Sequence, residues 1–381
     1  MKKICYVVTV PMTIKAFFIP QLKYLADNGY DVSVICSPDA ELQGLLGEKV
    51  RFIPIDIPRG LSLVGSFKAI SVLKKIFKRE KFDLVQYSTP NAALYASIAA
   101  KSSKIKLRNY HLMGFRYLGA GGLGRKILRF IEKTSCRNST SIECVSKSNL
   151  ELGIREKIFP REKATVVWNG SSGGVDLQRF NAQNREQWRS ETRTENNIEP
   201  TEFVYGFVGR ITKDKGISEL IEAYEKVLSK KPMGTKLVLV GNLDDSHGLS
   251  PEIIGKIENS KDILHITQKS DIERYYPLFD VLLLPSYREG FGNVVIEAQA
   301  MGVPTIVSDI PGPTDAMLDG ETGAKVPVGD VEKLAETMEK ALEFGKEFSQ
   351  NATEFVQKTF SSEILCEKIL QRKQELLGLK D

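Results

Sequence analysis

The sequence predicts an α/β protein built from two doubly wound parallel-sheet domains. Short apolar runs alternate with amphipathic helical patterns along most of the 381 residues, and such alternation is typical of a parallel sheet covered by helices on both faces. The chain is too long for one ordinary core and suits two domains. Residues 168–200 interrupt the alternation with Gly, Asn, Ser and charged residues, so we expect the domain boundary there.

The individual elements follow from the apolar runs and the residues that end them. Gly29 ends the first long helical pattern, because glycine readily adopts the left-handed conformation beyond a helix end. In the first half we expect strands at 4–10, 32–36, 52–55 and 84–87, and helices at 17–28, 67–79 and 92–101. In the second half we expect strands at 203–208, 236–240, 263–266, 281–285 and 305–308, helices at 216–229, 272–276 and 293–301, and a helical tail over 331–377.

The net charge of +5 is distributed unevenly along the chain. Residues 1–180 hold 29 Lys and Arg against 14 Asp and Glu, whereas residues 181–381 hold 24 against 34. A basic half suggests contact with nucleic acid, a phospholipid surface or a phosphorylated substrate. The basic stretches show no ladder of aromatic residues and no recognisable nucleic-acid module, so we expect no nucleic-acid partner.

The sequence indicates a cytoplasmic protein. The longest uncharged run, 84–100, contains Gln, Ser, Thr, Pro and Asn and does not read as a membrane span. Residues 1–10 imitate a signal peptide but lack a small-residue cleavage site, so a buried first strand is expected. The five cysteines form no C-x-x-C pair, which argues against a disulfide framework or a zinc ribbon and favours a reducing compartment.

The most informative motif is the run PSYREGFGNVVIE at 285–297. A buried strand ends here, a glycine-containing loop follows, and a helix begins near Asn293. Glycines allow close approach of the backbone to a ligand, and the amides of a first helical turn favour a bound phosphate. Glu289 and Glu297 beside such a site are suited to hydroxyl groups of ribose or hexose, although a turn residue and a solvated helix residue would look the same.

A second motif favours the functional interpretation. The strand 203–208 is followed by the loop GRITKDKG at 209–216, which holds three cations within an otherwise acidic domain. Arg210 is suited to bidentate contact with a diphosphate, and Lys215 acts as a point charge. A solvated basic loop remains the alternative.

Together these motifs resemble those of the retaining GT4-type glycosyltransferases of the GT-B fold. The resemblance rests on the pairs 209–210 and 215–216, on Glu289 and Glu297 at the E-x7-E spacing, and on the run GVPT at 302–305. It implies two Rossmann-like domains facing across a cleft. The acceptor-binding domain would then be 1–180, the nucleotide-sugar-binding domain 181–355, and 356–381 a C-terminal helix that packs back towards the N-terminal domain.

The resemblance also implies roles for individual residues. Arg210 and Lys215 would hold the diphosphate of a nucleotide sugar, preferably a UDP-sugar, and stabilise the departing nucleotide without a metal or other cofactor. Glu289 would contact hydroxyls of the donor sugar, and Glu297 the ribose. The backbone of the glycine loop would bind phosphate and sugar oxygens. The residues of that loop are Gly290, Phe291, Gly292, Asn293 and Val294.

The first domain matches the family less well. His111 occupies the place of a family histidine near the reacting centre, so we add it to the predicted catalytic residues Glu289, Arg210 and Lys215, although a structural histidine at a strand end is the alternative. The family's Gly-Gly turn after the first strand is missing, and Lys15 in that loop is expected to supply charge instead.

A basic segment in the first domain indicates a surface for a membrane. Residues 119–124 match G-x-G-x-x-G, but no convincing strand precedes them, so we do not expect a dinucleotide site. The following helical segment combines cations with apolar residues, which fits either a core helix with a solvated face or a helix lying on an anionic membrane beside the acceptor. The cations assigned to this surface are Arg116, Arg125, Lys126 and Arg129, together with Lys15.

The resemblance thus implies a glycosyltransferase that moves a hexose or N-acetylhexosamine from a nucleotide sugar to a lipid-linked saccharide in surface polysaccharide or glycan assembly. Together with the basic first half, it leads us to expect the protein at the inner face of the membrane. Three alternatives remain. An isomerase related to UDP-N-acetylglucosamine 2-epimerase would release an epimer without any acceptor. A hydrolase would use Glu289 and Glu297 as its carboxylate pair, and a non-catalytic subunit would bind donor without turnover.

Overall fold

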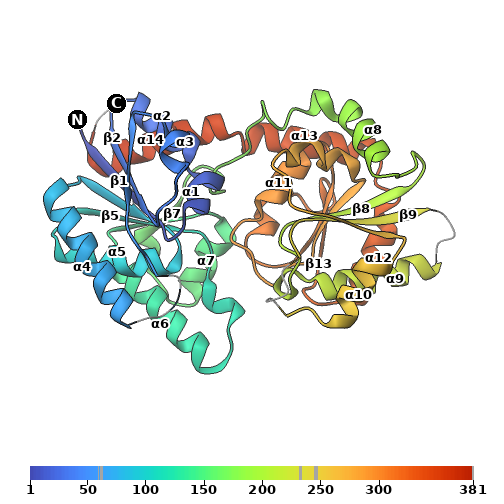
Figure 1. Ribbon diagram of the computed structural model, residues 1–381, viewed down its shortest axis with the longest axis horizontal. Coiled ribbons are helices and arrows are strands. Elements are labelled where there is room, and N and C mark those ends of the chain that lie inside the picture. The colour runs from blue at the N-terminus through green and yellow to red at the C-terminus, as the bar shows by residue number, and fades with distance from the viewer. Residues whose placement is uncertain (59, 61–62, 231–233, 244–247, 380–381) are drawn as a thin grey trace. The chain divides into compact units, whose positions relative to one another are not determined.

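The structure is a computed structural model that describes residues 1–58, 60, 63–230, 234–243 and 248–379. Contacts within the chain divide it into two compact units. Unit 1 comprises Met1–Gly174 and Ser362–Asp381, and unit 2 comprises Val175–Ser361. The expected boundaries lie after residue 180 and before residue 356. In the structure the first unit ends at Gly174 and resumes at Ser362. Each unit holds one parallel sheet with helices on both sides (Figure 1).

Unit 1 is built on a parallel sheet with a switch in strand order. Its strands are β1 (Lys3–Val7), β2 (Asp31–Cys36), β3 (Val50–Pro54), β4 (Leu84–Tyr87), β5 (Leu107–Leu112), β6 (Ser141–Cys144) and β7 (Ala164–Val166). They are arranged as β3-β2-β1-β4-β5-β6-β7. The order reverses between β1 and β4, and ligands of such sheets bind beyond the carboxyl ends of the strands at the reversal.

Strand β5 is absent from the expected elements because polar residues interrupt its apolar pattern. The side chain of Asn109 donates to Oε1 of Gln86 on β4 over 2.9 Å and accepts from Oγ of Ser141 on β6 over 2.8 Å. All three residues are buried. Cross-strand hydrogen bonds therefore satisfy the polar groups inside the sheet, and a sequence pattern read one strand at a time does not reveal this pairing.

Two layers of helices cover the sheet of unit 1. Helices α4, α5 and α6 contact one another in that order and share one core cluster, whereas α2 contacts both α3 and α14 in a second cluster. The helix expected over 17–28 is broken at Phe18, because Pro20 lacks the amide that a continuous helix would need. The helices are α1 (Pro11–Phe17), α2 (Ile19–Asp27), α3 (Leu42–Leu46), α4 (Leu63–Glu80), α5 (Pro90–Ser102), α6 (Gly122–Asn138), α7 (Lys147–Arg155) and α14 (Ser362–Leu377).

The last helix, α14, is tied to unit 1 by a buried ion pair. Nζ of Lys373 lies 3.0 and 2.9 Å from the two carboxylate oxygens of Glu143 on β6, and it also donates to Oε1 of Gln86 over 2.7 Å. Lys373 is 1% exposed. A buried ammonium group without its carboxylate would be strongly destabilising, so this contact fixes α14 against the sheet of unit 1.

Unit 2 has the strand order of a dinucleotide-binding fold. Its strands are β8 (Phe203–Val208), β9 (Thr235–Val240), β10 (Ile263–Ile266), β11 (Val281–Leu284), β12 (Thr305–Ser308) and β13 (Gly323–Val326). They lie parallel in the order β10-β9-β8-β11-β12-β13. The order reverses between β8 and β11, which pair through Tyr205 with Val281 and Gly206 with Leu282.

Two expectations for the helices of unit 2 are corrected by the structure. The segment 272–276 forms two short 3₁₀ turns, η6 (Ile272–Arg274) and η7 (Tyr276–Leu278), because Pro277 prevents a longer helix. The helical tail over 331–377 is three helices, because the non-helical residues 342–345 and 360–361 interrupt it. The helices of unit 2 are α8 (Arg185–Glu195), α9 (Ile217–Lys230), α10 (Pro251–Asn259), α11 (Asn293–Ala300), α12 (Val331–Ala341) and α13 (Lys346–Thr359).

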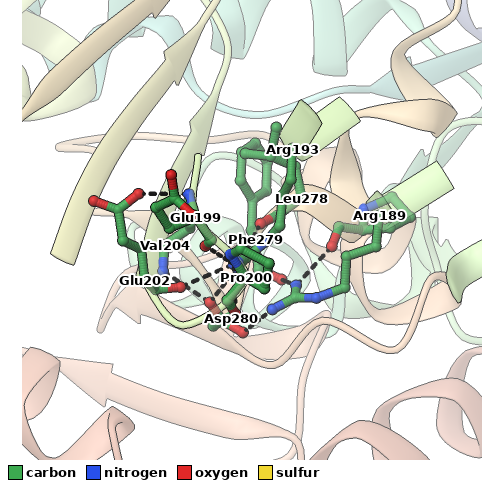
Figure 2. Close-up of polar contacts among 10 residues, drawn as sticks. Arg189, Arg193, Glu199, Pro200, Glu202, Val204, Leu278, Phe279 and Asp280 are labelled. Atoms are coloured by element: carbon green, nitrogen blue, oxygen red, sulfur yellow. Dashed lines mark hydrogen bonds and ion pairs between the residues drawn. The ribbon is translucent and has the colours of Figure 1, made fainter. Parts of the chain in front are cut away.

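A cluster of two arginines and one aspartate joins α8 to the start of two central strands. Asp280, just before β11, accepts from Nη2 of Arg189 over 2.6 Å, from Nη2 of Arg193 over 2.8 Å and from the backbone amide of Val204 over 2.8 Å (Figure 2). Nη1 of Arg189 and both Nη atoms of Arg193 also donate to backbone carbonyls. These belong to Pro277 and Phe279 for Arg189, and to Glu199, Pro200, Glu202 and Leu278 for Arg193.

Candidate active site

The predicted donor-binding residues gather where the strand order of unit 2 reverses. The loop 209–216 follows β8, and the loop 285–292 follows β11, the strand next to it. Both loops therefore leave the carboxyl edge of the sheet at its switch point, where doubly wound sheets bind their ligands. The sequence motifs and the topology point independently to the same edge.

Glycines bring the loops of this edge into close contact. A Cβ atom on Gly241, after β9, would lie 1.8 Å from the carbonyl oxygen of Gly209. A Cβ atom on Gly216 would lie 2.2 Å from the carbonyl oxygen of Pro285. Both glycines also have positive φ angles, 152° and 72°, which disfavour other residues. The two motifs are thus held together by backbone contacts that any larger residue would disrupt.

Lys215 and Glu289 form the central ion pair of the site. Nζ of Lys215 contacts Oε1 of Glu289, and the same oxygen accepts a hydrogen bond from Oγ of Ser286 over 2.9 Å. The lysine and glutamate side chains are only 17% and 14% exposed. A cation and a carboxylate are therefore positioned side by side at the switch point.

A second group of charges surrounds Asp214 in the first loop. One carboxylate oxygen of Asp214 lies 3.7 Å from Nη2 of Arg210 and 3.5 Å from Nη2 of Arg288, and the other accepts from the Thr212 hydroxyl over 2.6 Å. Burial alone would raise the pKa of Asp214, but the hydroxyl and the guanidinium groups outweigh it and lower the pKa. Arg210 is half exposed and free to meet a ligand.

The glycine loop leads directly into α11. Gly292 caps the helix with φ of 88°, and a Cβ atom on Gly312 would lie 2.6 Å from the carbonyl oxygen of Gly290. The ring of Phe291 is buried and packs edge-on against Phe360. A ligand at this loop would therefore contact the backbone of Phe291 rather than its side chain. Because the first amides of a helix lack partners within the helix, this turn suits phosphate oxygens.

Glu297 lies one turn inside α11 and is held by a tyrosine. The Tyr276 hydroxyl donates to Oε2 of Glu297 over 2.5 Å, and the Tyr276 ring packs against Phe180 and Phe279. Burial raises the pKa of Glu297, while the tyrosine and the charge of Arg179 offset part of this rise.

A pocket of about 300 Å³ lies between these residues and the neighbouring strand ends. It contains both Arg210 and Glu297, so a ligand in it can contact the cationic loop and the carboxylate of α11 together. The other lining residues lie at or after the carboxyl ends of β8, β9 and β10. They are Val208, Gly209, Val240, Gly241, Asn242, Gln268, Lys269 and Ile272.

Two of the predicted residues, His111 and Lys15, belong to unit 1. His111 is 8% exposed near the end of β5, with its ring edge-on against Phe18 and no hydrogen-bond partner for Nε2 among the described residues. Burial lowers its pKa to about 4, Glu143 opposes this and Lys373 adds to it. Lys15 is paired with Asp39 and Glu41 over 3.0 and 3.1 Å, so its charge is largely compensated within the protein.

The basic segment forms the amphipathic helix α6 with exposed apolar residues. Leu123, Ile127 and Phe130 are 73%, 43% and 71% exposed and lie on one face of the helix. Lys126 and Arg116 are exposed as well. The other two cations, Arg125 and Arg129, lie 3.7 and 3.4 Å from the carboxylate of Glu156. Of the described helices, none has the length and apolar content to cross a bilayer.

Four residues of the site are not among those predicted from the sequence. Ser286 and Tyr276 donate to Glu289 and Glu297, whereas Arg288 of the second loop contacts Asp214 inside the cationic loop. The three-residue spacing of Ser286 and Glu289 is a local signal that could have been noticed. Tyr276 and Arg288 reach the site only through the fold. Among the described residues, no three His, Cys, Asp or Glu side chains are grouped as metal ligands would be.

Two Rossmann-like units, one carrying cations and carboxylates at its switch point, define a glycosyltransferase of the GT-B fold. The family profile described as "Glycosyl transferases group 1" matches residues 189–359, and that described as "Glycosyl transferase 4-like" matches residues 3–146. The chain belongs to the GT4-type glycosyltransferase family.

Known glycosyltransferases and a solved structure are similar to this chain over most of its length. The capsular polysaccharide biosynthesis glycosyltransferase CapM of Staphylococcus aureus is 31% identical over 97% of this chain and 96% of its own length. The UDP-Gal:alpha-D-GlcNAc-diphosphoundecaprenol alpha-1,3-galactosyltransferase of Escherichia coli is 24% identical over 87% and 86%. Sucrose-phosphate synthase of Thermosynechococcus elongatus, 19% identical, superimposes with a TM-score of 0.80 over 99% of this chain and all of its own, which confirms the predicted fold.

Proposed function

We propose that this glycosyltransferase moves a hexose or N-acetylhexosamine from a nucleotide sugar, preferably a UDP-sugar, to a lipid-linked saccharide in surface polysaccharide assembly. The contact between Lys215 and Glu289 at the switch point carries the proposal, because it joins a phosphate-binding cation to a carboxylate suited to sugar hydroxyls. The names of the relatives support the setting: one acts in capsular polysaccharide biosynthesis and another on a diphosphoundecaprenol-linked sugar.

The proposed reaction retains the anomeric configuration. The bond between the anomeric carbon and the diphosphate oxygen breaks, and the acceptor hydroxyl forms the new bond on the same face while its proton passes to the leaving phosphate. Lys215 and Arg210 stabilise the charge that develops on the diphosphate. Preorganised charges in a partly buried site are usually the largest contribution to such a reaction. Glu289 orients the donor sugar, and Glu297 the ribose.

We further propose that the reaction needs no metal ion. The cations of two loops, Arg210, Lys215 and Arg288, can supply the positive charge that a divalent ion supplies elsewhere. Turnover should therefore change by less than about twofold after treatment with EDTA. A loss of turnover that Mg²⁺ or Mn²⁺ restores would contradict this part of the proposal.

The lipid-linked acceptor places the enzyme at a membrane surface, and α6 with the start of α4 is the proposed contact. Val64 and Phe67 of α4 are 82% and 73% exposed, and α4 and α6 flank α5 on one side of the sheet. Apolar side chains among lysines and arginines suit an anionic leaflet.

Two measurements test the function. Calorimetry with UDP-, GDP- and ADP-sugars should give one preferred donor, and that donor should be consumed with a diphosphoundecaprenol-linked saccharide as acceptor. Release of an epimer in the absence of acceptor would indicate an isomerase. Donor binding without turnover on any acceptor would indicate a non-catalytic subunit, and either result would contradict the proposal.

A further inference from the structure

The cation assigned to the diphosphate already has a carboxylate partner. Lys215 contacts Oε1 of Glu289, Ser286 donates to the same oxygen over 2.9 Å, and both charged side chains are largely buried. The hydrogen bond from Ser286 and the contact with Lys215 restrict the carboxylate to one position. A phosphate oxygen that binds the same ammonium group would lie roughly 4–5 Å from this carboxylate, given ordinary hydrogen-bond lengths on both sides.

The donor and its product differ in charge at this position. In a nucleotide sugar each phosphate carries one negative charge, and the sugar presents hydroxyl donors next to the terminal phosphate. In the free nucleoside diphosphate the terminal phosphate gains a second ionisation near pH 6, as phosphate monoesters do. The carboxylate of Glu289 would therefore accept hydrogen bonds from the donor sugar but face an additional negative charge in the product.

We infer that Glu289 is a specificity-determining residue that disfavours the nucleoside diphosphate product relative to the nucleotide sugar. This inference rests on the proposed function. Discrimination of this kind arises from an element that repels the wrong ligand as well as one that attracts the right ligand. Lys215 can bind the phosphates of both ligands. Because Glu289 lies in contact with Lys215, its carboxylate lowers the affinity for the more negatively charged product relative to the donor.

The inference predicts opposite effects of one variant on two ligands. In Glu289→Gln the charge is lost while the shape and the oxygen that accepts from Ser286 and Lys215 remain. The dissociation constant of UDP should fall about tenfold, whereas that of the matching sugar nucleotide, UDP-glucose or UDP-N-acetylglucosamine, should stay equal or rise. The inhibition constant of UDP should fall with its dissociation constant. GDP and GDP-mannose replace this pair if the wild type prefers guanine.

A matched control uses the second glutamate of the site. Glu297 does not contact Lys215 and faces a part of the ligand that donor and product share, so Glu297→Gln should change both affinities by the same factor. Ser286→Ala loosens the carboxylate without removing it and should shift the affinity ratio in the same direction as Glu289→Gln, by a smaller factor. It also serves as the test if Glu289→Gln does not fold.

The outcomes separate the inference from the proposed function. If the wild type binds neither nucleoside diphosphates nor sugar nucleotides, both fail. If the wild type binds and turns over a donor but Glu289→Gln leaves the ratio of UDP to UDP-sugar affinity within twofold of wild type, the inference alone is overturned. A weaker affinity of Glu289→Gln for UDP overturns it as well.

Discussion

The hydroxyl of Tyr276 and the carboxylate of Glu297 are joined by a hydrogen bond of 2.5 Å across two separate elements of unit 2. Tyr276 lies in the 3₁₀ turn η7, is fully buried, and is fixed by the rings of Phe180 and Phe279. This contact holds one oxygen of Glu297 and leaves the other for a ligand in the pocket that Glu297 lines.

Tyr276→Phe should therefore weaken donor binding by about tenfold, since hydrogen bonds to charged groups contribute ~1.5–3 kcal/mol. The tyrosine lowers the pKa of Glu297 against the effect of burial, so its loss should raise that pKa further. The pH at which donor affinity falls by half should move upward, as calorimetry between pH 5 and 8 would detect. Tyr275→Phe, at the neighbouring position, should leave both the affinity and the profile unchanged.

The structure explains why the residues of the candidate site could be grouped from the sequence. Its main residues belong to two short runs, each directly after an apolar strand, and strand order alone brings these runs together. Ser286 and Arg288 lie inside one of the runs. Ser286 is indicated only by its three-residue spacing from Glu289, and Arg288 carries no distinct signal. Tyr276 lies outside both runs, and only the packing of η7 beside α11 brings it to Glu297.

Part of unit 1 was less predictable because buried polar side chains lie among its central strands. The ladder of Gln86, Asn109 and Ser141, extended by Lys373 and Glu143, places hydrogen-bonded and charged groups where apolar patterns are expected. Each polar side chain is satisfied by a partner far away in sequence. Strands β5 and β6 could therefore be recognised only in the folded chain.

Lys215→Ala should lower turnover by roughly 10²–10³, because it removes a preorganised charge from the leaving diphosphate. The thermal unfolding midpoint should fall only modestly, since Ser286 still donates to the carboxylate of Glu289 after the lysine is removed. Lys213→Ala, which alters an exposed cation of the same loop, is the matched control and should change turnover by less than about threefold. Equal activity of the Lys215 variant and wild type would remove the diphosphate role of this residue.

The arginine cluster around Asp280 predicts a large effect on stability. Asp280→Ala leaves Arg193, which is 4% exposed, without its carboxylate, and breaking a buried pair costs ~3–5 kcal/mol. Denaturant unfolding can be followed through Trp188 on α8 in a Trp168→Phe background. Asp271→Ala, which removes an exposed partner of Arg274, should cost less than ~1 kcal/mol. Similar losses in the two variants would contradict a structural role for the cluster.

The lowered pKa of His111 should make the stability of unit 1 depend on pH. Burial lowers its pKa to about 4, whereas an unfolded histidine titrates near 6.5. Between these values the unfolded chain binds the additional proton, so stability should fall by up to ~3 kcal/mol as the pH decreases from 6.5 to 4. His111→Gln should flatten this dependence, followed through Trp168 in a Trp188→Phe background. His265→Gln, a substitution in unit 2, should leave the slope intact, and an unchanged slope in His111→Gln would contradict the assignment.

The exposed face of α6 predicts a variant that separates membrane binding from folding. Arg125 and Arg129 contact Glu156, so reversing their charges would also break contacts within unit 1. The variant Leu123→Ser, Lys126→Glu, Phe130→Ser changes only exposed side chains. It should reduce partitioning onto phosphatidylglycerol vesicles more than tenfold, since each cation contributes about 1 kcal/mol and each apolar side chain ~1.5–3 kcal/mol. Lys358→Glu, on α13 of unit 2, should bind like wild type. If sedimentation with vesicles is unchanged in the triple variant, α6 is a solvated helix of unit 1 and any membrane contact lies elsewhere.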